Sequence, residues 1–159
     1  MPAAAHTAGI ALHRVQDGVD EVLLVHPGGP FWAGKDEHAW SVPKGEFDPS
    51  AEAPIDAAAR EFTEELGHPP PETDRSRWRE LPSFRAGRKT LHCWLVDGDF
   101  DTTTIASNEF EMEWPPRSGS TARFPEVDAA RWFPIEVAAT KLHKGQRPLC
   151  ELILDALGN

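Results

Sequence analysis

Three glutamates stand close together in the chain, at Glu61, Glu64 and Glu65. In an α-helix these positions are i, i+3 and i+4, so the three carboxylates would project from one stripe of the helix surface. Clustered carboxylates repel one another, and a hard cation such as Mg²⁺ or Mn²⁺ removes this repulsion while the carboxylates replace part of its water shell. The spacing therefore predicts a site for a divalent cation on an acidic helix face.

The segment that carries these glutamates has the signals of an amphipathic helix over Pro54 to Leu66. Pro54 suits the first helical turn, where its missing N–H costs nothing, and Gly67 is well placed to end the helix. The opposite stripe has helical apolar spacing and is expected to pack against a core. It consists of Ile55, Ala58, Ala59, Phe62 and Leu66.

Seven residues before, within and after this helix have the types and spacing of a longer motif. They are Gly45, Glu52, Arg60, Glu61, Glu64, Glu65 and Gly67. Together they resemble the Nudix box, the metal-binding loop–helix–loop of the Nudix hydrolases. The sequence departs from the family pattern twice: six residues rather than five separate Gly45 from Glu52, and His68 replaces an aliphatic residue. Every charged position is filled.

The resemblance implies hydrolysis of a nucleoside diphosphate linked to another moiety, by attack of water on phosphorus. It implies that Mg²⁺ or Mn²⁺ is held by Glu61, Glu64 and Glu65, with the backbone carbonyl of Gly45 as a further oxygen ligand. The bound ion would neutralise phosphate oxygens and acidify a water molecule. The general base varies between branches of the family, and Glu61 is the leading candidate here, with Glu64 assigned to the same catalytic centre.

Arg60 is also assigned to this centre, where it is expected to orient Glu61 or to pair with Glu52 rather than to touch substrate. A plainer interpretation of the helix exists. Arg60 and Glu64 also form an ordinary i,i+4 ion pair, and acidic helices are most often solvated faces. The presence of the whole motif, rather than of its acidic part alone, favours the metal site.

A further catalytic carboxylate is expected from outside the motif. Many Nudix enzymes add an acidic residue from a loop beyond the box, shortly before an aromatic residue in the last strands, and Glu126, six residues ahead of Trp132, resembles that position. Glu111 and Glu113 compete with it, because alternation along a strand would place both on one face. For each of the three, a surface carboxylate without a catalytic role is the alternative.

Residues just before the motif are candidates for substrate binding. Trp32 and Trp40 lie near the box, and an aromatic face there would stack on a nucleobase. We expect Trp40 in the core and keep Trp32 as a candidate. Lys44 adjoins Gly45 and is predicted to contact phosphate as a point charge.

Two cues to the substrate class disagree. The run from Trp40 to Gly45 resembles the start of the box in Nudix enzymes that act on nucleoside triphosphates or dinucleoside polyphosphates. Phe84, a further candidate for substrate binding, falls near an aromatic position that diadenosine polyphosphate hydrolases usually fill with tyrosine. Pro82 falls near a proline that marks ADP-ribose pyrophosphatases. We rank nucleoside polyphosphates first and ADP-ribose or a nucleotide sugar second, and hydrolysis of oxidised dGTP stays open.

Two interpretations without turnover also stay open. The fold would serve as a nucleotide-binding module, although the intact set of Glu61, Glu64 and Glu65 argues against this because a pure binder has no need of it. Alternatively, the glutamates would hold a purely structural cation. In that case a chelator would lower the melting temperature while the protein hydrolyses nothing.

Composition limits the partners. The formal net charge of −10 argues against a nucleic-acid polymer, which binds through clustered Lys and Arg, but suits a small nucleotide whose phosphates a divalent cation bridges. Cys93 and Cys150 do not make a disulfide framework or a zinc motif, which favours the cytoplasm. No apolar run has membrane-spanning length, and Met1 to His6 lack a signal-peptide pattern. We expect a soluble protein without a membrane partner, as a monomer or homodimer.

The remaining segments indicate an α/β fold in one domain over residues 1–159. A turn at residues 16–18 joins the first two of the expected strands, since Asp17-Gly18 is a hairpin signal. The expected strands are Ala8 to Val15, Val22 to His26, Trp78 to Leu81, Lys89 to Val96 and Phe110 to Trp114. Helical spacing recurs over Ile135 to Leu142 and Pro148 to Leu157. The pattern predicts a mixed sheet with helices on both faces, the α/β/α sandwich that the Nudix resemblance also implies.

Overall fold

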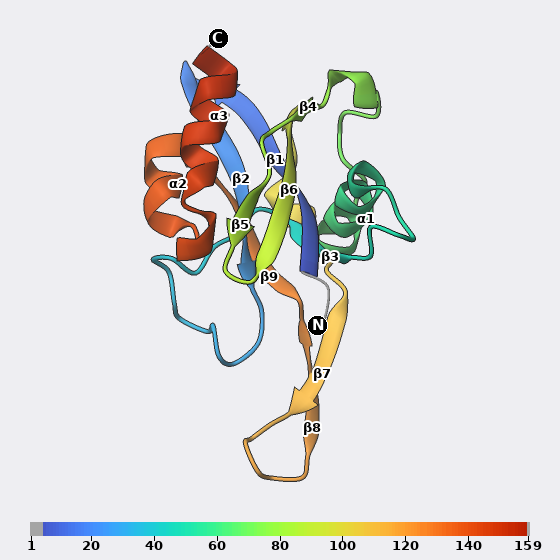
Figure 1. The fold of residues 1–159 in the computed structure, drawn as a ribbon. Helices are drawn as coiled ribbons and strands as arrows, with labels where there is room; N and C mark the ends of the chain where they lie inside the picture. The colour runs from blue at the N-terminus through green and yellow to red at the C-terminus, as the bar shows by residue number, and fades with distance from the viewer. Residues whose placement is uncertain (1–4, 159) are drawn as a thin grey trace.

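The computed structural model describes residues 5–158, whose elements form three layers (Figure 1). A β-sheet stands in the middle, with α1 (Pro54–Leu66) on one face and α2 (Ile135–Lys141) and α3 (Pro148–Gly158) on the other. This arrangement confirms the predicted α/β/α sandwich. Part of the N-terminal segment on which we based the expectation of no signal peptide, residues 1–4, lies outside the described residues.

The other elements are short and follow one another closely along the chain. The strands are β1 (Ala5–Gln16), β2 (Val19–Pro27), β3 (Lys44–Phe47), β4 (Arg79–Glu80), β5 (Phe84–Ala86), β6 (Lys89–Asp97), β7 (Glu109–Glu113), β8 (Thr121–Pro125) and β9 (Val127–Pro134). Single turns of 3₁₀ helix are η1 (Arg75–Arg77), η2 (Thr102–Thr104) and η3 (Lys144–Gln146). Over residues 5–158, the helices are all too short or too polar to cross a membrane.

Strand β1 is the centre of the main sheet. The order is β4-β6-β1-β2-β9, with β3 also paired to β1 and β5 to β6. β1 and β6 run parallel, whereas the other paired strands of the described chain are antiparallel, so the sheet is mixed as predicted. β7 and β8 form a separate two-stranded hairpin that extends beyond the end of the main sheet (Figure 1).

Alternation along β1 divides the core in two. Ile10 and Leu12 pack under α1, while Ala11 points to the opposite face, which α2 and α3 cover. This is the period of two expected of a strand buried on both faces. α1 places four fully buried residues on the sheet, namely Ala57, Ala58, Phe62 and Leu66. Their burial fixes which face of α1 points away from the core.

The bounds of α1 are those that its sequence predicts. Pro54 lies in the first turn, and Gly67 ends the helix in the left-handed region at φ 80°, with its N–H donated to the Thr63 carbonyl at 2.8 Å. Glycine has no Cβ to oppose this conformation. The helix that carries the three glutamates is therefore confirmed.

Elsewhere the structure adds to the predicted elements. The two long N-terminal strands, the strand after position 89 and both C-terminal helices are confirmed. The sequence pattern does not indicate β3, β5 or β8, which have four, three and five residues. β4 keeps only Arg79 and Glu80 of the strand expected over Trp78 to Leu81. Residues 115–120 lie in the turn of the β7–β8 hairpin.

Truncation of Phe62 will test how far α1 depends on its buried stripe. Phe62 is fully buried and its ring meets that of Phe100 edge-on at 5.9 Å, so Phe62→Ala should lower the free energy of unfolding by about 3–5 kcal/mol. Urea denaturation measures the change. The neighbouring exposed substitution Thr63→Ala should cost less than about 1 kcal/mol. Equal losses in the two variants would show that the buried face does not hold the helix.

Candidate functional site

The backbone of Gly45 lies directly against the carboxylate of Glu61. Pairing of β3 with β1 sets Gly45 opposite Ala8, and α1 packs over the same strands. A Cβ atom added to Gly45 would stand 2.1 Å from Glu61 Cδ, far inside any real contact distance. Glu61 itself is 8% exposed. Glycine is therefore required at position 45 for the carboxylate to occupy its place.

Arg60 compensates the acidic face of α1. Its Nε and Nη2 atoms donate to the two carboxylate oxygens of Glu52, both at 2.9 Å, and Nη1 donates to Glu61 at 2.9 Å and to Glu64 at 3.2 Å. The bond from Arg60 lowers the pKa of Glu52. Arg60 thus contacts both partners named for it from the sequence, Glu52 and Glu61.

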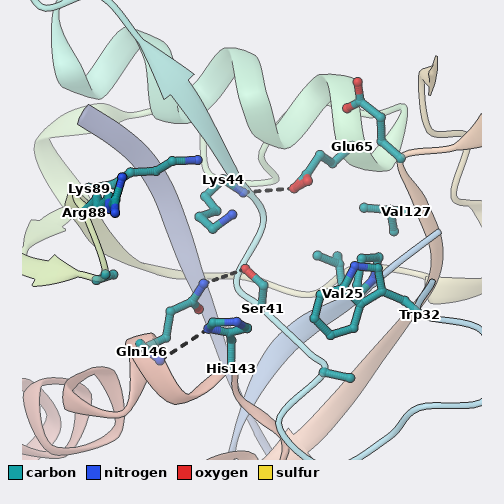
Figure 2. A pocket seen from close by; sticks show the side chains of 16 residues that line it. Val25, Trp32, Ser41, Lys44, Glu65, Arg88, Lys89, Val127, His143 and Gln146 are labelled. Atoms are coloured by element: carbon teal, nitrogen blue, oxygen red, sulfur yellow. Dashed lines mark hydrogen bonds between the residues drawn. The ribbon is translucent and has the colours of Figure 1, made fainter. Parts of the chain in front are cut away.

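Glu65 occupies the side of the helix nearest to β3. Its Oε1 atom accepts a hydrogen bond from the backbone N–H of Lys44 at 2.9 Å, which Figure 2 shows. Burial is the main cause that raises the pKa of Glu65 to about 8; the negative charges of Glu61 and Glu126 act in the same direction, and the N–H and positive charge of Lys44 oppose them. Burial also raises the pKa of Glu61, with repulsion from Glu64 as the next cause. Burial, and then mutual repulsion, thus disfavour the charged forms of Glu61 and Glu65.

Glu126 joins this cluster from the junction of β8 and β9. Its backbone carbonyl accepts from the Gly28 N–H at 2.9 Å, and its N–H donates to the Asn108 carbonyl at 2.8 Å. Partial burial and the charge of Glu64 raise the pKa of Glu126, and the charge of Glu126 in turn raises the pKa of Glu61. A residue 65 positions after Glu61 in the chain thus lies within electrostatic reach of it.

The two competing glutamates lie in the hairpin instead. Glu111 faces Arg123 across the strand pair at 3.9 Å, and Glu113 accepts from the backbone N–H groups of Arg117 and Gly119 at the hairpin turn. Both carboxylates are exposed. Of the three candidates named from the sequence, the structure brings Glu126 alone to the acidic face of α1.

The donor set suits a divalent cation after a local change of side-chain partners. Within residues 5–158, no three acidic, histidine or cysteine side chains converge as a metal cage in their present rotamers. Their oxygens accept hydrogen bonds within the protein instead: Arg60 donates to Glu61 and Glu64, and the Lys44 N–H donates to Glu65. Carboxylate oxygens beside the Gly45 backbone, where a Cβ would collide with Glu61, are the hard oxygen ligands that Mg²⁺ or Mn²⁺ prefers.

A cavity of about 560 Å³ opens beside the cluster, a size typical of small-molecule sites. Lys44, Glu65 and Glu126 line it on the side of α1. His143 and Gln146 line the opposite side, as Figure 2 shows. Glu65 thus connects the acidic face of α1 to a cavity whose other end is lined by a histidine and a glutamine.

Gln146 is held firmly at the far side of this cavity. It is 3% exposed; its amide oxygen accepts from the Val42 N–H at 3.2 Å, and its amide nitrogen donates to the Ser41 hydroxyl at 2.8 Å. Neither Gln146 nor His143 was indicated by the sequence, because η3 carries no motif and falls between two helical segments. Arg88 and Lys89, at the start of β6, add positive charge to the lining.

The other predicted substrate contacts fall in different places. Trp32 is partly buried and lines the cavity, as does Lys44. Trp40 is 4% exposed and donates its indole N–H to Asp36, which agrees with the core position expected for it. Phe84 packs against the core beneath α2 and α3 and is not among the residues that line the cavity.

His26 fixes the loop that carries Trp32. The imidazole is 7% exposed, with Nδ1 2.9 Å from Asp128 Oδ1 and Nε2 2.7 Å from the carbonyl oxygen of Lys35. Lys35 in turn donates its N–H to the Trp32 carbonyl at 3.0 Å. The wall that Trp32 adds to the cavity is therefore tied to β2 and β9 rather than left as a free loop.

Comparison with solved structures finds the same fold at low identity. An Ap4A hydrolase from C. elegans, in a binary complex, is 19% identical with a TM-score of 0.63, and 97% of this chain and 98% of that chain are covered. The NUDIX domain of NrtR from Shewanella oneidensis, complexed with ADP ribose, is 18% identical with a TM-score of 0.64, covering 99% and 90%. The E. coli ORF135 protein is 22% identical with a TM-score of 0.61, covering 96% and 90%.

At these identities the structural likeness establishes the fold alone. Comparison with curated proteins gives no match. The family model described as the NUDIX domain matches residues 5–153, which include Glu61, Glu64, Glu65, Glu126 and all of the residues that line the cavity. The chain therefore belongs to the Nudix family.

Proposed function

We propose that this protein is a divalent-metal-dependent hydrolase that cleaves a pyrophosphate linkage in a nucleoside polyphosphate by attack of water on phosphorus. One observation carries the proposal: the carboxylates of Glu61, Glu64, Glu65 and Glu126 lie within electrostatic reach of one another, and Glu65 and Glu126 line a cavity of about 560 Å³. A polyphosphate lying along these carboxylates would have its terminal nucleoside inside the cavity.

The ligands assigned to Mg²⁺ or Mn²⁺ are Glu61, Glu64, Glu65 and the carbonyl of Gly45. When bound, such an ion neutralises phosphate oxygens and lowers the pKa of a coordinated water. Arg60 donates two bonds to Glu52 and one to Glu61, and Glu64, which is partly exposed, would exchange its bond from Arg60 for a place among the ligands of the ion. The ion pair between Arg60 and Glu52 would then keep Arg60 in position while Glu64 changes its partner.

Proton transfer is assigned to a carboxylate whose environment raises its pKa. Glu61 meets this condition through burial and repulsion from Glu64, and it lies at the centre of the cluster. Glu126 meets it from the junction of β8 and β9. A raised pKa lies closer to neutral pH, and a general base accepts and returns a proton most efficiently when its pKa is close to the pH at which the enzyme works. We assign the base to Glu61 and a supporting role at the same water to Glu126.

The cavity provides separate places for a base and for phosphates. Trp32 offers an aromatic face, and Gln146 offers an amide held by two hydrogen bonds, both suited to a nucleobase. Lys44, Arg88 and Lys89 supply the positive charge that phosphate oxygens need. The earlier assignment of Phe84 to substrate binding stays a prediction, and it would require Phe84 to leave the core contact described above.

Hydrolysis of ADP-ribose or of a nucleotide sugar is the second candidate. It is favoured by the similarity of the fold to the NUDIX domain of NrtR complexed with ADP ribose. The same carboxylates would serve, because the scissile linkage is again a pyrophosphate. A nucleotide-binding module without turnover would leave all of these compounds intact, which separates it from both enzymatic candidates.

A substrate panel will test the proposal. Nucleoside triphosphates, dinucleoside polyphosphates, ADP-ribose and nucleotide sugars are incubated with Mg²⁺ or Mn²⁺, and products are resolved by chromatography. Glu64→Gln and Glu65→Gln should each lower kcat at least about 100-fold with the fold retained, because each removes an anionic ligand. Glu151→Gln, an exposed change on α3, is the matched control and should keep the wild-type rate. Wild-type rates in the first two variants would exclude the assigned centre.

Gly45→Ala tests the close approach of β3 to α1. The added methyl group would stand 2.1 Å from Glu61 Cδ, so the carboxylate must move and hydrolysis should fall at least about tenfold. Metal-dependent change in melting temperature and steady-state kinetics measure the effect. The control is Gly158→Ala, where no atom lies within 4 Å of the added Cβ. Full activity in Gly45→Ala would contradict the proposed position of Glu61.

Glu126→Gln tests the carboxylate that lies outside the motif. We expect kcat to fall by about tenfold or more, because the variant removes a carboxylate whose charge acts on Glu61 and Glu65. Glu111→Gln removes the same charge from the nearby hairpin and should change kcat less than about twofold, since Glu111 faces Arg123. A larger fall in kcat for Glu111→Gln than for Glu126→Gln would show that the catalytic carboxylate lies in the hairpin.

A further inference from the structure

A second hollow lies beside the cavity described above. It is a groove of about 410 Å³ between the loop that follows β2 and strand β7, and Phe31, Phe110 and Met112 are among its lining residues. Three residues line both the groove and the cavity: Pro27, Trp32 and Glu126. The groove and the cavity therefore meet at Glu126, with Trp32 as the wall between them.

The groove is joined to the acidic cluster by close backbone packing. The Gly28 N–H donates to the Glu126 carbonyl at 2.9 Å, and a Cβ on Gly28 would stand 2.0 Å from the Pro125 carbonyl oxygen. At Gly29, with φ at +97°, a Cβ would stand 2.9 Å from Phe110 Cζ. These two glycines let the loop lie flat against the hairpin, so the position of the groove is fixed relative to Glu126.

The chemistry of the groove suits an uncharged planar group. Phe31 is 62% exposed, and its ring meets that of Trp114 edge-on at 6.1 Å. Among the described residues that line the groove, Glu126 alone carries a charge, and it stands at the end next to the cluster. Phosphate would find no cation here, whereas the aromatic face of Phe31 is free to stack on a ring.

We propose that this groove receives the second nucleobase of a dinucleoside polyphosphate, an inference that rests on the proposed function. The first base occupies the cavity beyond Trp32, the phosphate bridge passes over the carboxylates of α1 and Glu126, and the second base stacks on Phe31 in the groove. Two hollows that open on one acidic cluster match a substrate with two bases joined by phosphates. A substrate with one base would leave the groove empty.

The test compares two substrates that differ only in the second nucleoside, diadenosine tetraphosphate and adenosine 5′-tetraphosphate. The measured quantity is the ratio of their kcat/KM values, with Mg²⁺ or Mn²⁺ present. In Phe31→Ala this ratio should fall about tenfold, the loss expected when one base no longer stacks on an aromatic ring. Phe31→Trp keeps an aromatic face and should keep the ratio. Leu154→Ala, which removes another exposed apolar side chain on α3, is the control and should leave the ratio unchanged.

The outcomes separate this inference from the function on which it rests. If the wild-type protein hydrolyses both compounds and Phe31→Ala leaves their ratio unchanged, the groove does not hold the second base, and the proposed function stands. If Phe31→Ala instead lowers kcat/KM for ADP-ribose or a nucleotide sugar alone, the inference is also overturned, because the groove then takes a sugar. If the wild-type protein hydrolyses no nucleoside polyphosphate, the proposed function fails and the inference fails with it.

Discussion

The close approach of the Gly45 backbone to the Glu61 carboxylate is the constraint on which the candidate site depends. It exists because β3 pairs with β1 while α1 packs on the same strands through Ala57 and Ala58. The small residues Ala57 and Ala58 let α1 approach the sheet closely. Because Gly45 has no side chain, the Glu61 carboxylate can occupy the space that a Cβ at position 45 would fill. The acidic face of α1 is thereby brought into the structure instead of being left in solvent.

Bringing carboxylates together creates an electrostatic problem that the chain solves only in part. Arg60 offsets the charge on three glutamates with one guanidinium, and Glu65 has a backbone N–H as its partner. The pKa values of Glu61, Glu65 and Glu126 remain raised. A protein that held these groups for stability alone would gain by replacing one of them. Their retention fits a site whose charge is completed by an ion and a substrate.

Local signals explain which parts of the fold the sequence predicts. Pro54 and Gly67 act on the backbone around them, so α1 was predicted with both bounds, and its three glutamates followed from helical spacing. β3 and β5, with four and three residues, are too short to show a clear period, and their partners in the sheet are β1 and β6. The choice between Glu126 and Glu111 depends on long-range packing of Glu126 against Gly28, and the spacing of residues along the chain does not indicate such packing. His143 and Gln146 enter the cavity for the same reason.

The parallel pairing of β1 with β6 also affects how the molecule is assembled. His6 pairs with Thr90 and His13 with Asp97, so the central strand must wait for a partner that is synthesised some 84 residues later. Closing so long a loop costs entropy before any contact repays it, whereas the β1–β2 hairpin closes at once through Asp17 and Gly18. We therefore expect a nascent chain to hold the β1–β2 hairpin early and to complete the sheet only after β6 has left the ribosome.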